Sequence, residues 1–197
     1  MREIEFWFSV GSTYTYLTVV RLAKIQCDHG IKLKLRPFSV RTIMQQMDNV
    51  PFPTSKKSKV DYMWRDIERR AIQYGFPAKV PAPYPLKQFD LANKLAILGV
   101  QEGWCAEYLT KTYIAWFQNC QEAGSDPNVT ETLISIGLNP SETLKKVEHP
   151  TIQEQYEQQT KIAKNKGIFG SPTFTVQDEL FWGDDRLDDA LKWAQEI

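Results

Sequence analysis

The spacing of apolar residues at the N-terminal end of the chain changes twice. Residues 4–10 form an apolar, aromatic-rich run, which is typical of a buried strand. Apolar residues then recur at helical spacing, which predicts a helix over residues 13–28. Apolar and charged residues alternate over residues 31–36, which indicates a second strand. We therefore expect a β-α-β unit with parallel strands and a right-handed crossover.

The turn between the first predicted strand and helix carries candidate chemistry. Gly11 allows a sharp backbone turn, and the side-chain oxygen of Ser12 or Thr13 is available to cap the helix. The unsatisfied N–H groups at a helix start favour an anionic ligand. An ordinary capped helix explains the same residues, so this turn alone does not predict a function.

The middle of the chain, from about residue 40 to residue 163, has a mostly helical pattern. One helix is expected around residues 43–47, and Pro residues make residues 75–85 an extended connection. On the helix over residues 57–74 we expect one face to carry Tyr62, Met63, Ile67 and Ala71. The other predicted helices cover residues 89–101, 107–122, 128–135, 141–147 and 151–166.

A glycine-rich stretch near the C-terminus leads into a second group of strands. Pro172 follows Ser171 and precedes a β-branched and aromatic run, and proline is tolerated at the first residue of a strand. X–Pro bonds are also where cis peptides occur, so we expect a cis bond here. Strands are predicted at residues 173–176 and 180–182, followed by a helix over residues 187–195. The acidic residues Asp184 and Asp185 precede that helix, where helix capping alone would explain them.

The composition excludes several classes of protein. The 197 residues have a formal net charge of zero, which argues against nucleic acid as a partner. No apolar run approaches the ~20 residues needed to cross a bilayer, so we expect no membrane partner. The three cysteines include no CxxC pair, which predicts a reducing cytoplasm rather than a disulfide framework. The two histidines lack ligand spacing, so we expect no metal site.

Three separated stretches together resemble one known family. They are residues 6–17, residues 59–69, and residues 167–175 followed by residues 181–187. With these stretches in this order, the chain resembles the 2-hydroxychromene-2-carboxylate isomerase family. That family is close to the kappa-class glutathione transferases in the DsbA-like branch of the thioredoxin superfamily. The resemblance covers nearly the whole chain.

The resemblance implies a fold and an activity. The fold is α/β, a thioredoxin-like domain (residues 1–39 and 164–197) with a large helical insertion (residues 40–163). The implied activity is glutathione-dependent isomerisation of 2-hydroxychromene-2-carboxylate to trans-o-hydroxybenzylidenepyruvate, a step in bacterial naphthalene degradation. The cofactor is glutathione, the substrate is a small aromatic molecule, and the implied assembly is a homodimer. A kappa-like transferase and a non-redox thioredoxin-fold binding protein are the alternatives.

The resemblance also implies roles for individual residues. Ser12 matches the serine that activates the glutathione sulfur, in place of the cysteine of redox members. Ser171 would present its backbone N–H and C=O to the cysteinyl part of glutathione, beside Pro172. The remaining binding residues implied are Asn49 for the tripeptide, Lys59 for a carboxylate, and Asp184 and Asp185 for the γ-glutamyl group, with Asp185 the expected salt-bridge partner.

The sequence departs from the family pattern at the turn and near the substrate pocket. Family members usually carry Ser-Pro-Tyr after the first strand, where this chain has Gly11-Ser12-Thr13-Tyr14. Lys87 stands where the family often has Asn, and Asn93 stands where it often has Arg. These departures predict that the substrate pocket differs from that of the family.

Overall fold

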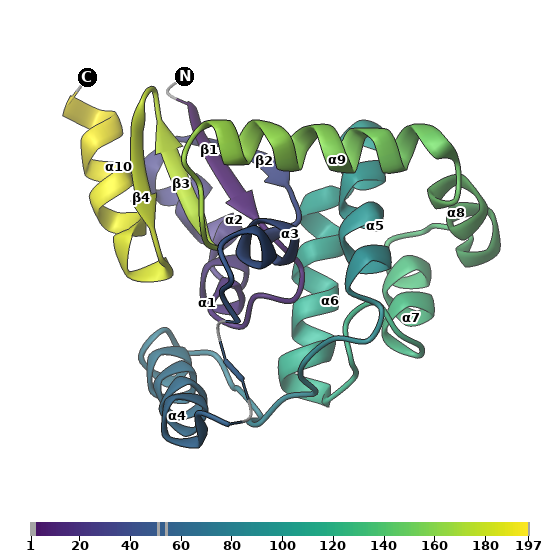
Figure 1. The fold of residues 1–197 in the computed structure, drawn as a ribbon, viewed down its shortest axis with the longest axis horizontal. Helices are drawn as coiled ribbons and strands as arrows, with labels where there is room; N and C mark the ends of the chain where they lie inside the picture. Colours follow the sequence, from purple (N-terminus) through teal and green to yellow (C-terminus); the bar gives the residue numbers. More distant parts are fainter. Residues whose placement is uncertain (1–2, 51, 54, 197) are drawn as a thin grey trace.

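Both ends of the chain contribute strands to one four-stranded mixed sheet (Figure 1). Strands β1 (Glu3–Phe8) and β2 (Lys32–Pro37) pair in parallel, as the predicted β-α-β unit requires. Strand β3 (Thr173–Val176) pairs antiparallel with β1, and β4 (Glu179–Trp182) pairs antiparallel with β3. The computed structural model describes residues 3–50, 52–53 and 55–196. The strand order is β2-β1-β3-β4.

Strand β1 lies at the centre of the core because its aromatic side chains are buried on both faces of the sheet. Phe6, Trp7 and Phe8 have no exposed surface. The Phe6 ring stacks on Phe174 of β3, and the Trp7 indole N–H donates to the Thr175 hydroxyl at 3.1 Å. The aromatic run of the sequence therefore fixes β1 against β3 as well as burying apolar surface.

The helix predicted over residues 13–28 is wrong in its continuity. The structure has two helices here, α1 (Thr15–Val19) and α2 (Leu22–His29), with Gly30 as a left-handed C-cap. At the break, the Arg21 N–H bonds the Thr18 carbonyl, while the Arg21 side chain bonds the Leu17 carbonyl and Asp184. The break between α1 and α2 contains no Gly or Pro. It coincides instead with the ion pair between Arg21 and the distant Asp184.

The chain between β2 and β3 supplies the helices of the predicted insertion. Figure 1 shows that α9 runs from the sheet to α8. Helices α5 and α6 lie on the same side of the molecule, and α4 lies apart from them. Met63, Ile67 and Ala71 are buried on one face of α4, but Tyr62, which we expected on that face, is 61% exposed. The helices are α3 (Val40–Gln46), α4 (Lys57–Gln73), α5 (Phe89–Glu102), α6 (Cys105–Asn119), α7 (Asn128–Ser135), α8 (Pro140–Val147) and α9 (Pro150–Asn165).

The C-terminal segment returns to the sheet through the proline loop. The Ser171–Pro172 peptide bond is cis, which confirms the prediction from the sequence. After β4, a short 3-10 helix η1 (Asp184–Arg186) leads into α10 (Leu187–Glu196), which packs against β3 and β1. None of the helices in the described ranges has the length and apolar character needed to cross a membrane.

Candidate active site

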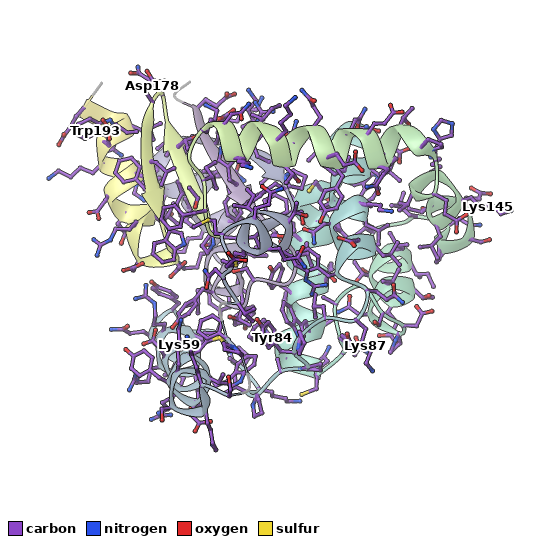
Figure 2. All side chains as sticks on the ribbon, viewed as in Figure 1. Lys59, Tyr84, Lys87, Lys145, Asp178 and Trp193 are labelled. Atoms are coloured by element: carbon purple, nitrogen blue, oxygen red, sulfur yellow. The ribbon has the colours of Figure 1, made fainter. Side chains whose placement is uncertain are left out.

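A cavity of about 1000 Å³ opens beside the turn that follows β1. Its lining comes from that turn, α3, α4, the loops on either side of α4, the start of α5, the proline loop, the end of β4 and η1. In Figure 2, Lys59 is seen on α4 and Tyr84 on the connection between α4 and α5. The residues predicted from the sequence all line this one cavity: Ser12, Asn49, Lys59, Ser171, Pro172, Asp184 and Asp185.

Ser12 faces the proline loop and does not cap the helix. Its hydroxyl donates to the Ser171 carbonyl at 2.5 Å, and its backbone N–H donates to Ser9. The N-cap of α1 is Tyr14, which makes no side-chain capping bond, and the Thr13 hydroxyl donates to the Met63 sulfur. Capping by Ser12 or Thr13 is therefore wrong, because each hydroxyl has a partner elsewhere in the chain.

Two buried residues that the sequence analysis did not single out for this task hold the Ser12 turn in place. The Asn93 amide oxygen accepts from the Val10 N–H at 2.7 Å, and its amide N–H donates back to the Val10 carbonyl at 2.8 Å. The Tyr113 hydroxyl lies 3.1 Å from the Ser12 carbonyl, which it bonds. Burial raises the pKa of Tyr113 above its usual value, so this hydroxyl stays a neutral donor. The one sign of this role in the sequence is that Asn93 is a polar residue among the apolar residues of α5.

Ser171 bonds both the turn after β1 and α1. Its hydroxyl accepts from the Ser9 N–H at 2.9 Å and lies 3.0 Å from the Thr15 hydroxyl. Its carbonyl accepts from the Ser12 hydroxyl, so a ligand would share that C=O with Ser12 through the second lone pair. The Ser171 N–H has no hydrogen-bond partner among the described residues, so it remains available to a ligand.

Asp184 is a buried carboxylate, and other side chains of the protein already donate hydrogen bonds to both of its oxygens. Its side chain is 1% exposed and forms ion pairs with Arg21 at 2.7 Å and Arg70 at 3.0 Å. The Thr18 and Tyr74 hydroxyls also donate to it, at 2.8 and 3.2 Å. Burial, together with the Asp184 charge, raises the pKa of Tyr74. Asp184 thus supports the site from behind and has little capacity left for a ligand.

Asp185 is placed differently although it is the next residue. Its side chain is 52% exposed and its one ion pair within the described residues is with Arg186, at 3.5 Å. No side-chain capping bond is present at the start of η1, whose N-cap is Gly183. The Asp185 carboxylate is therefore exposed in the cavity, where a cationic ligand group can reach it.

Asn49 and Lys59 lie on the segment that leads into and along α4. The Asn49 backbone N–H donates to Met44 at 2.9 Å, and the Asn49 side chain is exposed. The Lys59 ammonium lies 5.2 Å from the centroid of the Phe52 ring. Within the described residues no carboxylate lies within 4 Å of it, so its charge is available to an anionic ligand group.

The rest of the cavity has an apolar lining, which we define as Val40, Met44, Tyr84, Leu86 and Phe89. Gly11 touches this lining: its φ is +123°, and a Cβ there would lie 2.6 Å from the Phe89 ring. Only glycine fits such a position. The Arg41 guanidinium, which the sequence analysis missed, lies 4.0 Å above the Phe89 ring and donates to the Leu86 carbonyl at 3.2 Å. This arrangement suits a flat apolar ligand beside Ser12.

The described residues contain no grouping of three or more His, Cys, Asp or Glu side chains that would hold a metal ion. Cys27, Cys105 and Cys120 are free thiols, and none of them lines the cavity.

The chain is similar to several known proteins. A family model described as the DsbA-like thioredoxin domain matches residues 3–193. The 2-hydroxychromene-2-carboxylate isomerase of Pseudomonas putida is 28% identical over 93% of this chain and 90% of its own. A solved structure of a 2-hydroxychromene-2-carboxylate isomerase superposes with a TM-score of 0.85 at 26% identity, covering 98% of this chain and 94% of that one. Glutathione S-transferase kappa 1 of Rattus norvegicus is 22% identical over 95% of this chain and 88% of its own.

Proposed function

This chain belongs to the family of DsbA-like thioredoxin domains, and we propose that it is a glutathione-dependent isomerase. The proposed reaction converts 2-hydroxychromene-2-carboxylate to trans-o-hydroxybenzylidenepyruvate, within aromatic (naphthalene) catabolism. The observation that carries the proposal is the position of Ser12, with its hydroxyl at the cis-proline loop in the cavity. The names of the isomerase relatives support the reaction, and the kappa transferase relative supports glutathione.

The charged and polar lining fits glutathione group by group. The Asp185 carboxylate suits the γ-glutamyl ammonium, and the Lys59 ammonium suits a carboxylate. The free Ser171 N–H, beside Pro172, suits the backbone of the cysteinyl residue, and Asn49 adds an amide at the cavity edge. Asp184 would hold the turn before α10 in place rather than bind the ligand itself.

Ser12 would stabilise the thiolate form of the glutathione sulfur. A thiol with a pKa near 8.5 is mostly protonated at neutral pH, and lowering that pKa by ~2 units requires ~2.7 kcal/mol. A hydrogen bond from a hydroxyl to a charged group contributes ~1.5–3 kcal/mol, so Ser12 alone is of the right size. Helix α1 has only 5 residues, so a smaller share falls to the helix dipole than a long helix would supply. To act, the Ser12 hydroxyl turns from the Ser171 carbonyl to the sulfur.

When bound, glutathione supplies a thiolate that adds reversibly to the conjugated substrate, which permits bond rotation before the same thiolate leaves. No electrons are gained or lost overall, which agrees with serine at the position of the redox cysteine. The apolar lining would hold the aromatic ring of the substrate and exclude water from it.

The direct test is to supply 2-hydroxychromene-2-carboxylate with and without glutathione and to identify the product. Isomerised product formed only with glutathione, and with glutathione recovered unchanged, supports the proposal. A stable conjugate of glutathione with an electrophile would instead indicate a kappa-like transferase. The similarity to the kappa transferase of Rattus norvegicus supports this alternative. Glutathione binding without either product would indicate a binding protein.

We also propose a cytoplasmic homodimer. Free thiols, two of them exposed (Cys27 and Cys120), suit a reducing compartment. The dimer rests on the resemblance to the isomerase family, and sedimentation at several protein concentrations tests it.

A further inference from the structure

Among the described residues, four cationic side chains line the cavity, and they differ in whether a carboxylate of the protein pairs with them. Arg70 is paired with Asp184 at 3.0 Å, and Arg186 is paired with Asp189 at 2.9 Å. Arg41 and Lys59 have no carboxylate within 4 Å in the parts of the chain that the structure describes. Lys59 is exposed, whereas Arg41 is half-buried against the apolar lining.

Arg41 is held in one orientation by contacts that leave its charge uncompensated. Its guanidinium lies 4.0 Å above the Phe89 ring, and one N–H group donates to the Leu86 carbonyl at 3.2 Å. A guanidinium carries five N–H donors and stays charged at every physiological pH, so further donors remain for a ligand. Such a fixed, unpaired fork favours a planar carboxylate, which it can bind through two parallel hydrogen bonds.

The surroundings of Arg41 also indicate what is attached to that carboxylate. Phe89, Leu86 and Tyr84 line the cavity around it, and Gly11 brings the Ser12 turn against Leu86 and Phe89. Burial raises the pKa of Tyr84, and the nearby Arg41 charge partly opposes that shift. A neutral phenol therefore stands beside the cation, next to aromatic and aliphatic side chains. The cavity end next to Ser12 is thus suited to an aromatic carboxylate.

We infer that Arg41 binds the carboxylate of the isomerisation substrate and fixes the aromatic ring against Phe89 and Leu86, beside Ser12. This inference rests on the proposed function for the identity of the substrate. The two anionic ligands of the cavity then bind different cations: Arg41 binds the substrate carboxylate, and Lys59 binds a carboxylate of glutathione. Arg41 is then a specificity-determining residue, because neutral analogues of the substrate lack its partner.

The test measures binding without turnover. Calorimetric titration of 2H-chromene-2-carboxylate and of its methyl ester, against the wild type and Arg41→Gln, isolates the charge from the ring. We expect the wild type to bind the acid at least about tenfold more tightly than the ester, and Arg41→Gln to bind the two nearly equally. Arg41→Lys keeps the charge without the fork and is expected to recover part of the preference.

Steady-state kinetics provide the crossed control. Arg41→Gln is expected to raise the KM for 2-hydroxychromene-2-carboxylate and not for glutathione, and Lys59→Gln is expected to do the reverse. Equal preference for the acid over the ester in wild type and Arg41→Gln would overturn the inference. If the wild type binds the acid through Arg41 but does not isomerise the substrate, the proposed function fails while this binding role stands.

Discussion

The acidic and the apolar parts of the cavity use arginine in different ways. Beside η1, Arg21 and Arg70 are both paired with the buried Asp184, which also accepts from two hydroxyls. On the apolar lining, Arg41 stacks on Phe89 and meets no carboxylate of the described chain. An arginine that is paired with a carboxylate of the protein therefore stabilises the structure around the cavity. An arginine that is held in place without such a partner indicates where an anionic group of a ligand binds.

The same distinction separates neighbours. The Asp184 side chain is buried and bonded by four other side chains. The adjacent Asp185 is exposed, lines the cavity and has one weak surface ion pair. Substitution of Asp184 should therefore change stability, and substitution of Asp185 should change binding.

The largest expected effect on stability concerns Asp184. Asp184→Ala leaves the Arg21 and Arg70 charges without their partner, and breaking a buried ion pair costs about 3 kcal/mol or more. The partial exposure of both arginines keeps the loss near the lower end of that range. Urea unfolding with the slope held constant measures it. Asp184→Asn, which retains the shape, should lose less. Unchanged stability in Asp184→Ala would show that the ion pairs of Asp184 with Arg21 and Arg70 do not stabilise the fold.

The largest expected effect on turnover concerns Ser12. Ser12→Ala removes the donor to the sulfur, and loss of one anion-stabilising donor lowers kcat by ~10²–10³-fold. Thr13→Val is the matched control, because it removes the neighbouring hydroxyl, which bonds the Met63 sulfur, and keeps the shape. Glutathione-dependent turnover decides the matter. If Ser12→Ala and Thr13→Val lose activity to the same extent, the hydroxyl of Ser12 has no special role.

The smallest effect concerns Asp185. Asp185→Asn keeps the shape and removes the charge, so glutathione binding should weaken by about 1.5–3 kcal/mol. The melting temperature should not change, because the side chain is exposed and makes no capping bond. Asp188→Asn, on the first turn of α10 and outside the cavity lining, is the control. Equal affinity in Asp185→Asn and Asp188→Asn would move the ammonium site elsewhere.

The strands and most helices could be predicted from sequence because their signals are local. The apolar run of β1, the alternation in β2 and the helical spacing of α4 to α9 need no knowledge of distant residues. The break at Arg21 could not be predicted, because the side chain that bonds across it belongs to a pair with Asp184. The exposure of Tyr62 likewise depends on which face of α4 meets the core.

The candidate site divides in the same way. The predicted residues meet at one cavity because the turn after β1 and the cis-proline loop lie side by side across the β1–β3 pair. The roles of Asn93, Tyr113 and Arg41 depend on contacts between segments far apart in the chain. The sequence marks Asn93 only as a polar residue among apolar ones, and it carries no signal for the other two.

The central claim is that Ser12 stabilises a glutathione thiolate in this cavity, and titration of the bound thiol tests it most directly. The ultraviolet absorbance of the thiolate, followed against pH with saturating protein, gives the pKa of glutathione bound to wild type and to Ser12→Ala. A lowered pKa means that the bound thiol stays ionised as the pH falls towards neutrality. The account predicts a pKa ~2 units below that of the free thiol in the wild type, and most of that shift lost in Ser12→Ala. The same pKa in both proteins would contradict it.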